Sequence, residues 1–271
     1  MPATISPTTV LISGANRGLG KELLARYLAR PNHVAVAANR NPEHATSKAL
    51  AELPKGQGSR LVVVKLDASI EADAAKAVKQ LIAQGVDHLD VVIANAGVSY
   101  AWPKVADLKT EDLQGHLIPD LFGVIWLYQA AFPLLKKSMD PKWITIGSVA
   151  GKLENPTPSP LPSAPELTKY RDQPPIPNAA YATSKAAVHW VTKRINQEED
   201  WITAFVVHPG WVETDMGQAV MHGLGLAGKN VKLPIITVDE SCDGIVHLID
   251  VATRESHGGR FWDYDGARES W

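Results

Sequence analysis

The sequence has few cysteines and no cluster of charge of one sign. Cys242 is the only cysteine among 271 residues, so an intramolecular disulfide is excluded, as suits a protein of a reducing compartment. The 27 Lys and Arg residues against 29 Asp and Glu give a formal net charge of −2, and no basic block offers a surface for nucleic acid. The histidines are scattered without zinc-ligand spacing, so no metal site is predicted.

Long apolar runs are also scarce. The first nine residues show no basic region followed by an apolar stretch, so no signal peptide is expected. The longest apolar region, Leu121–Leu135, is interrupted by Gly123, Gln129 and Pro133 and is too short to span a bilayer. We therefore expect a cytoplasmic protein that has neither a membrane nor a nucleic acid as its partner.

What the sequence does contain is an alternation of apolar strands with amphipathic helices. Strands are predicted at Thr8–Ser13, Val34–Ala38, Leu61–Leu66, Leu89–Ala94, Lys142–Ile146, Trp201–Val207 and Arg260–Asp263. Helices are predicted at Gly18–Arg30, Pro42–Leu53, Glu71–Gln84, Thr110–Ser138, Asn178–Glu199 and Val238–Thr253. This order predicts an α/β fold with a doubly wound parallel sheet, Rossmann-like, of about seven strands with helices on both faces. No composition shift divides residues 1–271, so a single domain is expected.

One segment breaks this rhythm. Residues 154–177 hold 8 of the chain's 19 prolines, which excludes a regular helix or an interior strand there. An insertion of this length tends to be functional or disordered. Two interpretations stay open, a solvated surface insertion and a lid or wall over an active site.

The segment Ser13–Gly20 follows the first predicted strand and opens the first predicted helix. Its glycines, Gly14, Gly18 and Gly20, have the spacing G-x-x-x-G-x-G. Glycine permits a tight turn and close approach of the backbone to a pyrophosphate, and the helix N-terminus offers that anion N–H groups and a partial positive charge. The segment therefore predicts a dinucleotide-binding loop.

Further motifs follow this loop in order along the chain. They are Asn95-Ala96-Gly97 after the fourth strand, Ser148 after the fifth, Tyr181-x-x-x-Lys185, and Pro209-Gly210 with Thr214 after the sixth. Together with the glycine loop, in which Ser13 replaces a usual Thr, this series resembles the short-chain dehydrogenase/reductase family. The stretch His208–Met216 and the residues up to Trp271 are most similar to fungal ketoreductases of the norsolorinic-acid-ketoreductase type and to the carbonyl-reductase members.

The resemblance implies a nicotinamide cofactor, and charge favours NADP(H). Asn39-Arg40 ends the second strand without a carboxylate that would repel a 2′-phosphate, and Arg40, assisted by Arg17, can pair with that phosphate. By resemblance, Asp67 hydrogen-bonds the adenine and Asn95 supports the adenosine ribose region. The expected cofactor set is Gly14, Asn16, Arg17, Gly18, Leu19, Gly20, Asn39, Arg40, Asp67, Asn95, Ala96, Gly97, Tyr181, Lys185, Pro209, Gly210, Val212 and Thr214.

The expected catalytic residues are Ser148, Tyr181, Lys185 and Asp120. Tyr181 and Lys185 are four residues apart, which places them on one face of a helix, where an ammonium stabilises a phenolate. By resemblance, Tyr181 exchanges the proton, Ser148 hydrogen-bonds the substrate oxygen and Lys185 also holds the nicotinamide ribose. Asp120 stands where the family usually has an Asn that orders a water. We expect it to keep this relay and to shift the pH optimum; the alternative is an aspartate turned away from the site.

The predicted function is that of an NADPH-dependent ketoreductase or carbonyl reductase, an oxidoreductase of CH–OH and C=O groups. Aromatic and apolar residues near the expected site, Tyr100, Trp102, Trp211 and Met216, suggest a hydrophobic or aromatic secondary-metabolite substrate. The family implies that a variable region, residues 215–234, closes over substrate, and that the protein is a homodimer or homotetramer. Two alternatives stay open, a cofactor-dependent cyclase or isomerase without net redox chemistry and a non-catalytic dinucleotide-sensing protein.

Overall fold

The computed structural model describes residues 6–153, 177–223 and 235–271. Within them, a central sheet has eight strands in the order β10-β9-β6-β5-β4-β1-β2-β3. These strands are β1 (Thr8–Ser13), β2 (His33–Asn39), β3 (Arg60–Lys65), β4 (Val91–Ala94), β5 (Lys142–Ile146), β6 (Thr203–His208), β9 (Phe261–Asp263) and β10 (Arg268–Glu269). Neighbouring strands pair in parallel, except that β10 is antiparallel to β9. A separate parallel pair joins β7 (Trp211–Val212) to β8 (Ile235–Ile236).

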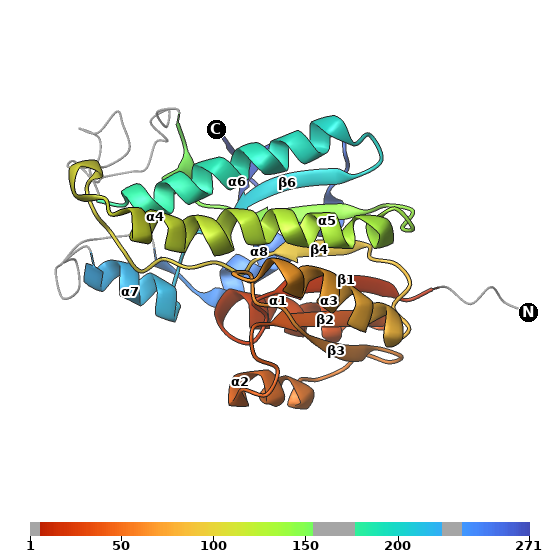
Figure 1. The fold of residues 1–271 in the computed structure, drawn as a ribbon. Coiled ribbons are helices and arrows are strands. Elements are labelled where there is room, and N and C mark those ends of the chain that lie inside the picture. The colour runs from red at the N-terminus through yellow and green to blue at the C-terminus, as the bar shows by residue number, and fades with distance from the viewer. Residues whose placement is uncertain (1–5, 154–176, 224–234) are drawn as a thin grey trace, which may run out of the picture.

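Helices cover both faces of this sheet (Figure 1). They are α1 (Gly18–Leu28), α2 (Ala45–Lys48), α3 (Glu71–Ala83), α4 (Thr110–Leu117), α5 (Gly123–Leu135), α6 (Ala179–Glu198), α7 (Asp215–Gly223) and α8 (Val238–Val251). On one face, α3, α5 and α6 contribute Leu81, Leu127 and Val188 to one buried cluster. On the other, α1 and α8 contribute Leu24 and Ile245 to a second. The sheet therefore separates two apolar cores, because the Val- and Ile-rich strands bury side chains on both faces.

The predicted doubly wound, Rossmann-like fold is confirmed, with differences in detail. The main sheet has eight strands instead of about seven, because two-residue strands such as β10 are too short to leave a periodic pattern. The predicted helix Pro42–Leu53 is shorter, consisting of α2 and a 3₁₀ turn at Ala49–Glu52. The proline-rich insertion 154–177 lies outside the described residues except for Pro177. Of the variable region 215–234, residues 215–223 are described and residues 224–234 are outside the described ranges.

The central helical region differs from the single helix predicted at Thr110–Ser138. A π-helical turn, η3 (Ile118–Phe122), joins α4 to α5. Pro119 lacks an N–H donor, and the wider π turn accommodates that loss. By length and composition alone the stretch Thr110–Leu135 is apolar enough to cross a membrane. In this fold α5 packs six buried residues against the sheet, which is the position of a core helix.

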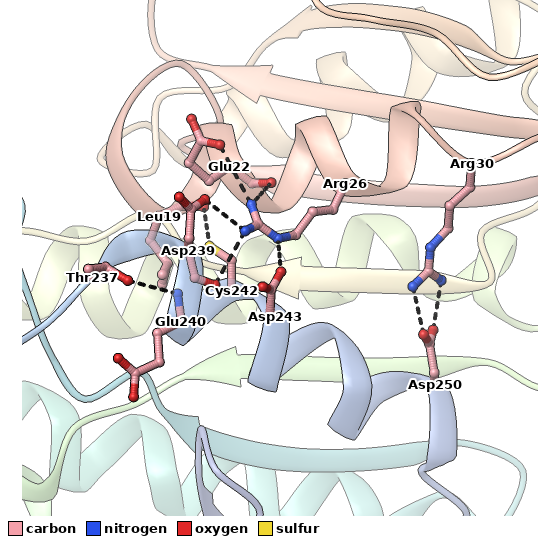
Figure 2. Close-up of polar contacts among 10 residues, drawn as sticks. All are labelled: Leu19, Glu22, Arg26, Arg30, Thr237, Asp239, Glu240, Cys242, Asp243 and Asp250. Atoms are coloured by element: carbon pink, nitrogen blue, oxygen red, sulfur yellow. Dashed lines mark hydrogen bonds and ion pairs between the residues drawn. The ribbon is translucent and has the colours of Figure 1, made fainter.

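Ionic contacts hold α1 against α8 (Figure 2). Arg26 pairs with Asp239 at 2.9 Å and with Asp243 at 2.6 Å. One turn further along α1, Arg30 makes two bonds to Asp250, at 2.8 and 2.6 Å. These contacts fix the helix that begins at the glycine loop.

Candidate active site

The glycine loop connects β1 to α1 and takes conformations that favour glycine. Gly14 and Gly18 have φ of +66° and +52°, in the left-handed region. A Cβ on Gly20 would lie 2.4 Å from the Gly14 carbonyl oxygen, so only glycine fits there. Arg17, at the N-cap of α1, makes no capping hydrogen bond through its side chain. The N–H groups of the first turn are therefore available to an anion such as a pyrophosphate.

Polar side chains beneath the loop fix its path. The Ser13 hydroxyl accepts the N–H groups of Asn95 and Ala96, both at 3.0 Å, and the Asn95 amide donates to the Ser13 carbonyl at 2.9 Å. The Asn39 side-chain oxygen Oδ1 accepts the Ala15 N–H at 2.9 Å. Asn39 and Asn95, two of the predicted cofactor residues, thus hold the loop through their side chains.

The two arginines expected at a 2′-phosphate differ in their surroundings. Arg40 is exposed at the end of β2 and forms no ion pair with any residue in the described ranges. Arg17 pairs with Asp215 of α7 at 3.3 Å, with both side chains more than two-thirds exposed. A cavity of about 510 Å³ opens beside Arg17, with Asn16 and Thr46 also in its lining, and the Asn16 amide donates to the Thr46 hydroxyl at 2.6 Å. Arg40 is therefore free to meet an anion, whereas Arg17 must first leave Asp215.

The loop after β6 faces the glycine loop. A Cβ built on Gly18 would lie 3.7 Å from the Thr214 methyl group. Gly210 has φ of +81°, and the Pro209 carbonyl accepts the Ser241 hydroxyl at 2.6 Å, which ties the turn to α8. Thr214 therefore lies across from the first turn of α1, and Pro209 and Gly210 form the turn that precedes it. Asp67 lies after β3, at the same carboxyl edge of the sheet, where its carboxylate accepts the Ser69 N–H at 2.9 Å.

Tyr181 and Lys185 lie one turn apart on α6, as predicted. The Lys185 ammonium is buried, donates to the Ile146 carbonyl at 2.9 Å, and lies 5.6 Å from the centre of the Tyr181 ring. Tyr181 is partly exposed, and its ring meets that of His116 edge-on at 6.4 Å. The pair therefore presents a phenol next to a fixed positive charge at the end of β5.

Ser148 follows β5 and begins a 3₁₀ turn, η4 (Val149–Gly151), whose Ala150 N–H its hydroxyl accepts at 3.2 Å. The turn packs directly on α6, because a Cβ on Gly151 would lie 2.7 Å from the Lys185 backbone. His189 of α6 accepts the Ser148 N–H at 3.2 Å. Sequence reasoning assigned no function to His189, and no spacing signal marks it.

Asp120 points inward from η3 and is 1 % exposed. Its carboxylate accepts the Val98 N–H at 2.8 Å and the Ser184 hydroxyl at 2.9 Å. A Cβ on Gly97 would lie 3.1 Å from the Asp120 carboxylate and 3.6 Å from the Lys185 ammonium. The aspartate is thus not turned away, and it shares with Lys185 the space left by a glycine.

The expected pocket residues are more dispersed. Tyr100 is half exposed and stacks on His116 with ring centres 4.3 Å apart. The Trp102 indole N–H is buried without a hydrogen-bond partner among the described residues. Met216 is 40 % exposed on α7, and Trp211 lies in β7. These contacts do not by themselves define a pocket.

A glycine loop before α1, with a Ser, a Tyr and a Lys at the same edge of the sheet, is the arrangement expected of a nicotinamide-dependent oxidoreductase. The family model described as short chain dehydrogenase matches residues 8–161. Norsolorinic acid ketoreductases of Dothistroma septosporum and Aspergillus parasiticus are 36 % and 35 % identical, over 97 % of this chain and 92 % and 91 % of theirs. The NADPH-bound carbonyl reductase from chicken fatty liver is 25 % identical with a TM-score of 0.78, covering 98 % of this chain and all of that one.

The chain therefore belongs to the short-chain dehydrogenase/reductase family. Its relatives support an oxidoreductase that acts on carbonyl or alcohol groups of a small molecule with a nicotinamide dinucleotide cofactor.

Proposed function

We propose that this protein is an NADPH-dependent ketoreductase in which Tyr181 is the general acid and base. The observation that carries the proposal is the packing of the Ser148 turn on the helix that bears Tyr181 and Lys185, next to a glycine loop whose helix N-terminus is uncapped by a side chain. Proton transfer and dinucleotide binding thereby share one edge of the sheet, where such sites lie in doubly wound folds.

The preference for NADPH rests on charge at the end of β2. Arg40 is exposed and has no ion-pair partner among the described residues, and no carboxylate precedes it on that strand. A guanidinium pairs well with a phosphate dianion. The fit of the loop to a dinucleotide rests on the glycine positions that a Cβ would fill. The similar carbonyl reductase from chicken fatty liver has NADPH bound.

In ketone reduction each residue has a distinct task. The nicotinamide, when bound, supplies the hydride. The Ser148 hydroxyl donates a hydrogen bond to the substrate oxygen, and the Tyr181 hydroxyl gives its proton to that oxygen as negative charge develops there. The Lys185 ammonium, fixed by the Ile146 carbonyl, stabilises the resulting phenolate. Alcohol oxidation follows the same steps in reverse.

A hydrophobic aromatic substrate is the best candidate. Tyr100 presents half of its surface near the Tyr181 end of the site, over His116, and fungal relatives carry the name norsolorinic acid ketoreductase.

We extend the proposal to a cytoplasmic homodimer or homotetramer by family resemblance. The second candidate function, cofactor-dependent cyclisation or isomerisation without net redox chemistry, is favoured by the unusual Asp120 and by the long proline-rich insertion, residues 154–177.

The test is a turnover assay that follows NADPH absorbance with aromatic ketones, quinones and polyketide-like carbonyls. Tyr181→Phe removes only the hydroxyl, so we expect kcat to fall at least about 100-fold, since positioned proton transfer contributes that much or more. NADPH should still bind the variant, and NADH should support slower turnover than NADPH at equal concentration. Tight NADPH binding with no turnover of any ketone would favour the non-redox function instead.

A further inference from the structure

His189 is a buried side chain that the proposed mechanism does not use. It lies one turn beyond Lys185 on α6 and is 2 % exposed. Its Nε2 atom faces the Ser148 backbone N–H at 3.2 Å and must accept that proton, so the ring's own proton lies on Nδ1. Nδ1 has no hydrogen-bond partner among the described residues. Within the described part of the chain, the ring therefore hydrogen-bonds to the Ser148 N–H alone.

The ring is held in place from two sides. On the strand side, Gly147 leaves the space that the ring occupies, since a Cβ there would lie 2.4 Å from His189 Nε2. On the other side, the Phe261 and Trp271 rings lie 4.6 and 6.1 Å from it, centre to centre. Phe261 and Trp271 also stack on each other at 5.9 Å. The segment from β9 to Trp271 thus closes behind the histidine.

The surroundings also keep the ring neutral. Burial, followed by the nearby Lys185 ammonium and His208, lowers the pKa of His189 to about 3. A protonated imidazole would bring an N–H donor against the Ser148 N–H, whereas the neutral ring accepts a hydrogen bond. The acceptor is therefore present throughout the pH range of an ordinary assay.

We propose that His189 is a positioning residue, which fixes the Ser148 turn so that the serine hydroxyl meets the substrate oxygen, and that Phe261 and Trp271 fix His189 in turn. The inference rests on the proposed function of Ser148. In this proposal the segment from β9 to Trp271, which is far from Ser148 in sequence, helps to position the Ser148 hydroxyl by packing on His189. Small displacements of a hydrogen-bond donor at a reacting oxygen cost about 100-fold in rate.

The test compares His189→Leu, which removes the acceptor, with His189→Gln, which offers an amide oxygen at similar reach. We expect His189→Leu to lower kcat about 10- to 100-fold while the Kd of NADPH stays unchanged, and His189→Gln to recover most of kcat. The matched control is His257→Leu. His257 is also a buried histidine between aromatic rings, Phe205 and Trp262, but it precedes β9 at the opposite edge of the sheet, and its substitution should leave kcat unaffected.

A double-mutant cycle separates positioning from general stability. If His189 acts through Ser148, His189→Leu has little further effect on kcat in a Ser148→Ala background. An equal loss in both backgrounds, or an equal loss in His257→Leu, overturns the proposal. If His189→Leu does not fold, Trp271→Ala replaces it in the same cycle, with a smaller expected loss.

Hydrogen exchange at the Ser148 amide provides a readout without turnover. We expect faster exchange in His189→Leu than in the unmodified protein and in His189→Gln, because the amide loses its acceptor. Unchanged protection overturns the proposal. Absence of ketone reduction in the unmodified protein would instead refute the proposed function, and the amide measurement would still decide whether His189 holds Ser148.

Discussion

At the residue scale, Asp120 and Lys185 place opposite charges beside Gly97 in the interior. Asp120→Asn keeps the side-chain shape and the acceptor for the Val98 N–H but removes the negative charge. The Lys185 ammonium then acts on Tyr181 without partial cancellation. We therefore expect a retained kcat and a pH–rate profile for ketone reduction that moves to lower pH.

The measurement is kcat/KM against pH for the unmodified protein and Asp120→Asn. Ser184→Ala is the control, because it removes a hydroxyl that donates to the Asp120 carboxylate while leaving both charges in place. A profile that does not move in Asp120→Asn would show that the aspartate only holds η3 against the loop after β4.

The residues that could be predicted from the sequence are those whose type and spacing carry the chemistry. The residues of the glycine loop lie within seven consecutive positions, and Tyr181 and Lys185 are four positions apart, so both patterns are visible in the sequence. The contact of His189 with Ser148 spans 41 positions, and that of Asn39 with Ala15 spans 24. Such contacts form only when the chain folds, so no local sequence pattern predicts them.

At the scale of elements, the order of strands and helices was predictable because each leaves an apolar period. The π-helical turn η3 was not. Its cause is partly local, at Pro119, and partly tertiary, since a Cβ on Gly123 would lie 2.4 Å from the Ala68 carbonyl after β3. The close approach of α5 to that loop is a property of the packed sheet. As a result Asp120 lies in η3, whose geometry the sequence does not specify.

The α1–α8 contact gives a prediction at the same scale. The Arg26 side chain is 20 % exposed and pairs with Asp239 and Asp243 of α8 and with Glu22 of its own helix. Arg30, at 33 % exposure, pairs with Asp250 alone. The two α8 carboxylates at Arg26 are themselves largely exposed, which limits the gain. We expect Arg26→Met to lower the free energy of unfolding by about 1–2 kcal/mol and Arg30→Met by about 0.5 kcal/mol.

Urea unfolding of the two variants checks this order, since methionine retains the aliphatic packing of arginine and removes the guanidinium with its charge and hydrogen-bond donors. High salt should narrow the difference between each variant and the unmodified protein, because exposed pairs are screened. Equal losses in both variants would mean that the additional carboxylates at Arg26 add nothing to stability.

At the scale of the whole molecule, the sheet brings distant segments together at one edge. Two histidines are buried there, His189 and His208, and their burial makes the stability of the fold sensitive to acid. Burial, with Lys185 and His208 nearby, lowers the pKa of His189 to about 3, and burial with Lys152 nearby lowers that of His208 to about 4. In the unfolded chain the pKa of a histidine is about 6.5. Below that pH only the unfolded chain takes up these two protons, so the folded state loses stability as the pH falls toward 4.

Each of these histidines contributes a slope of up to about 1.4 kcal/mol per pH unit. Asp263 opposes them, since burial raises its pKa to about 6, and between about pH 4 and 6 the folded state binds that proton more readily than the unfolded chain does. His257, whose pKa burial also lowers, acts in the same direction as His189 and His208. His88 acts with Asp263, because its contacts with Asp87 and Asp90 raise its pKa against the effect of burial. Three groups with a lowered pKa against two with a raised pKa leave a net loss of stability on acidification. Urea unfolding between about pH 7 and 5 should therefore give a falling free energy of unfolding, and His208→Gln should flatten the slope because one of the histidine protons is gone. A free energy that stays constant over this range would mean that the buried rings become hydrated and protonated without unfolding.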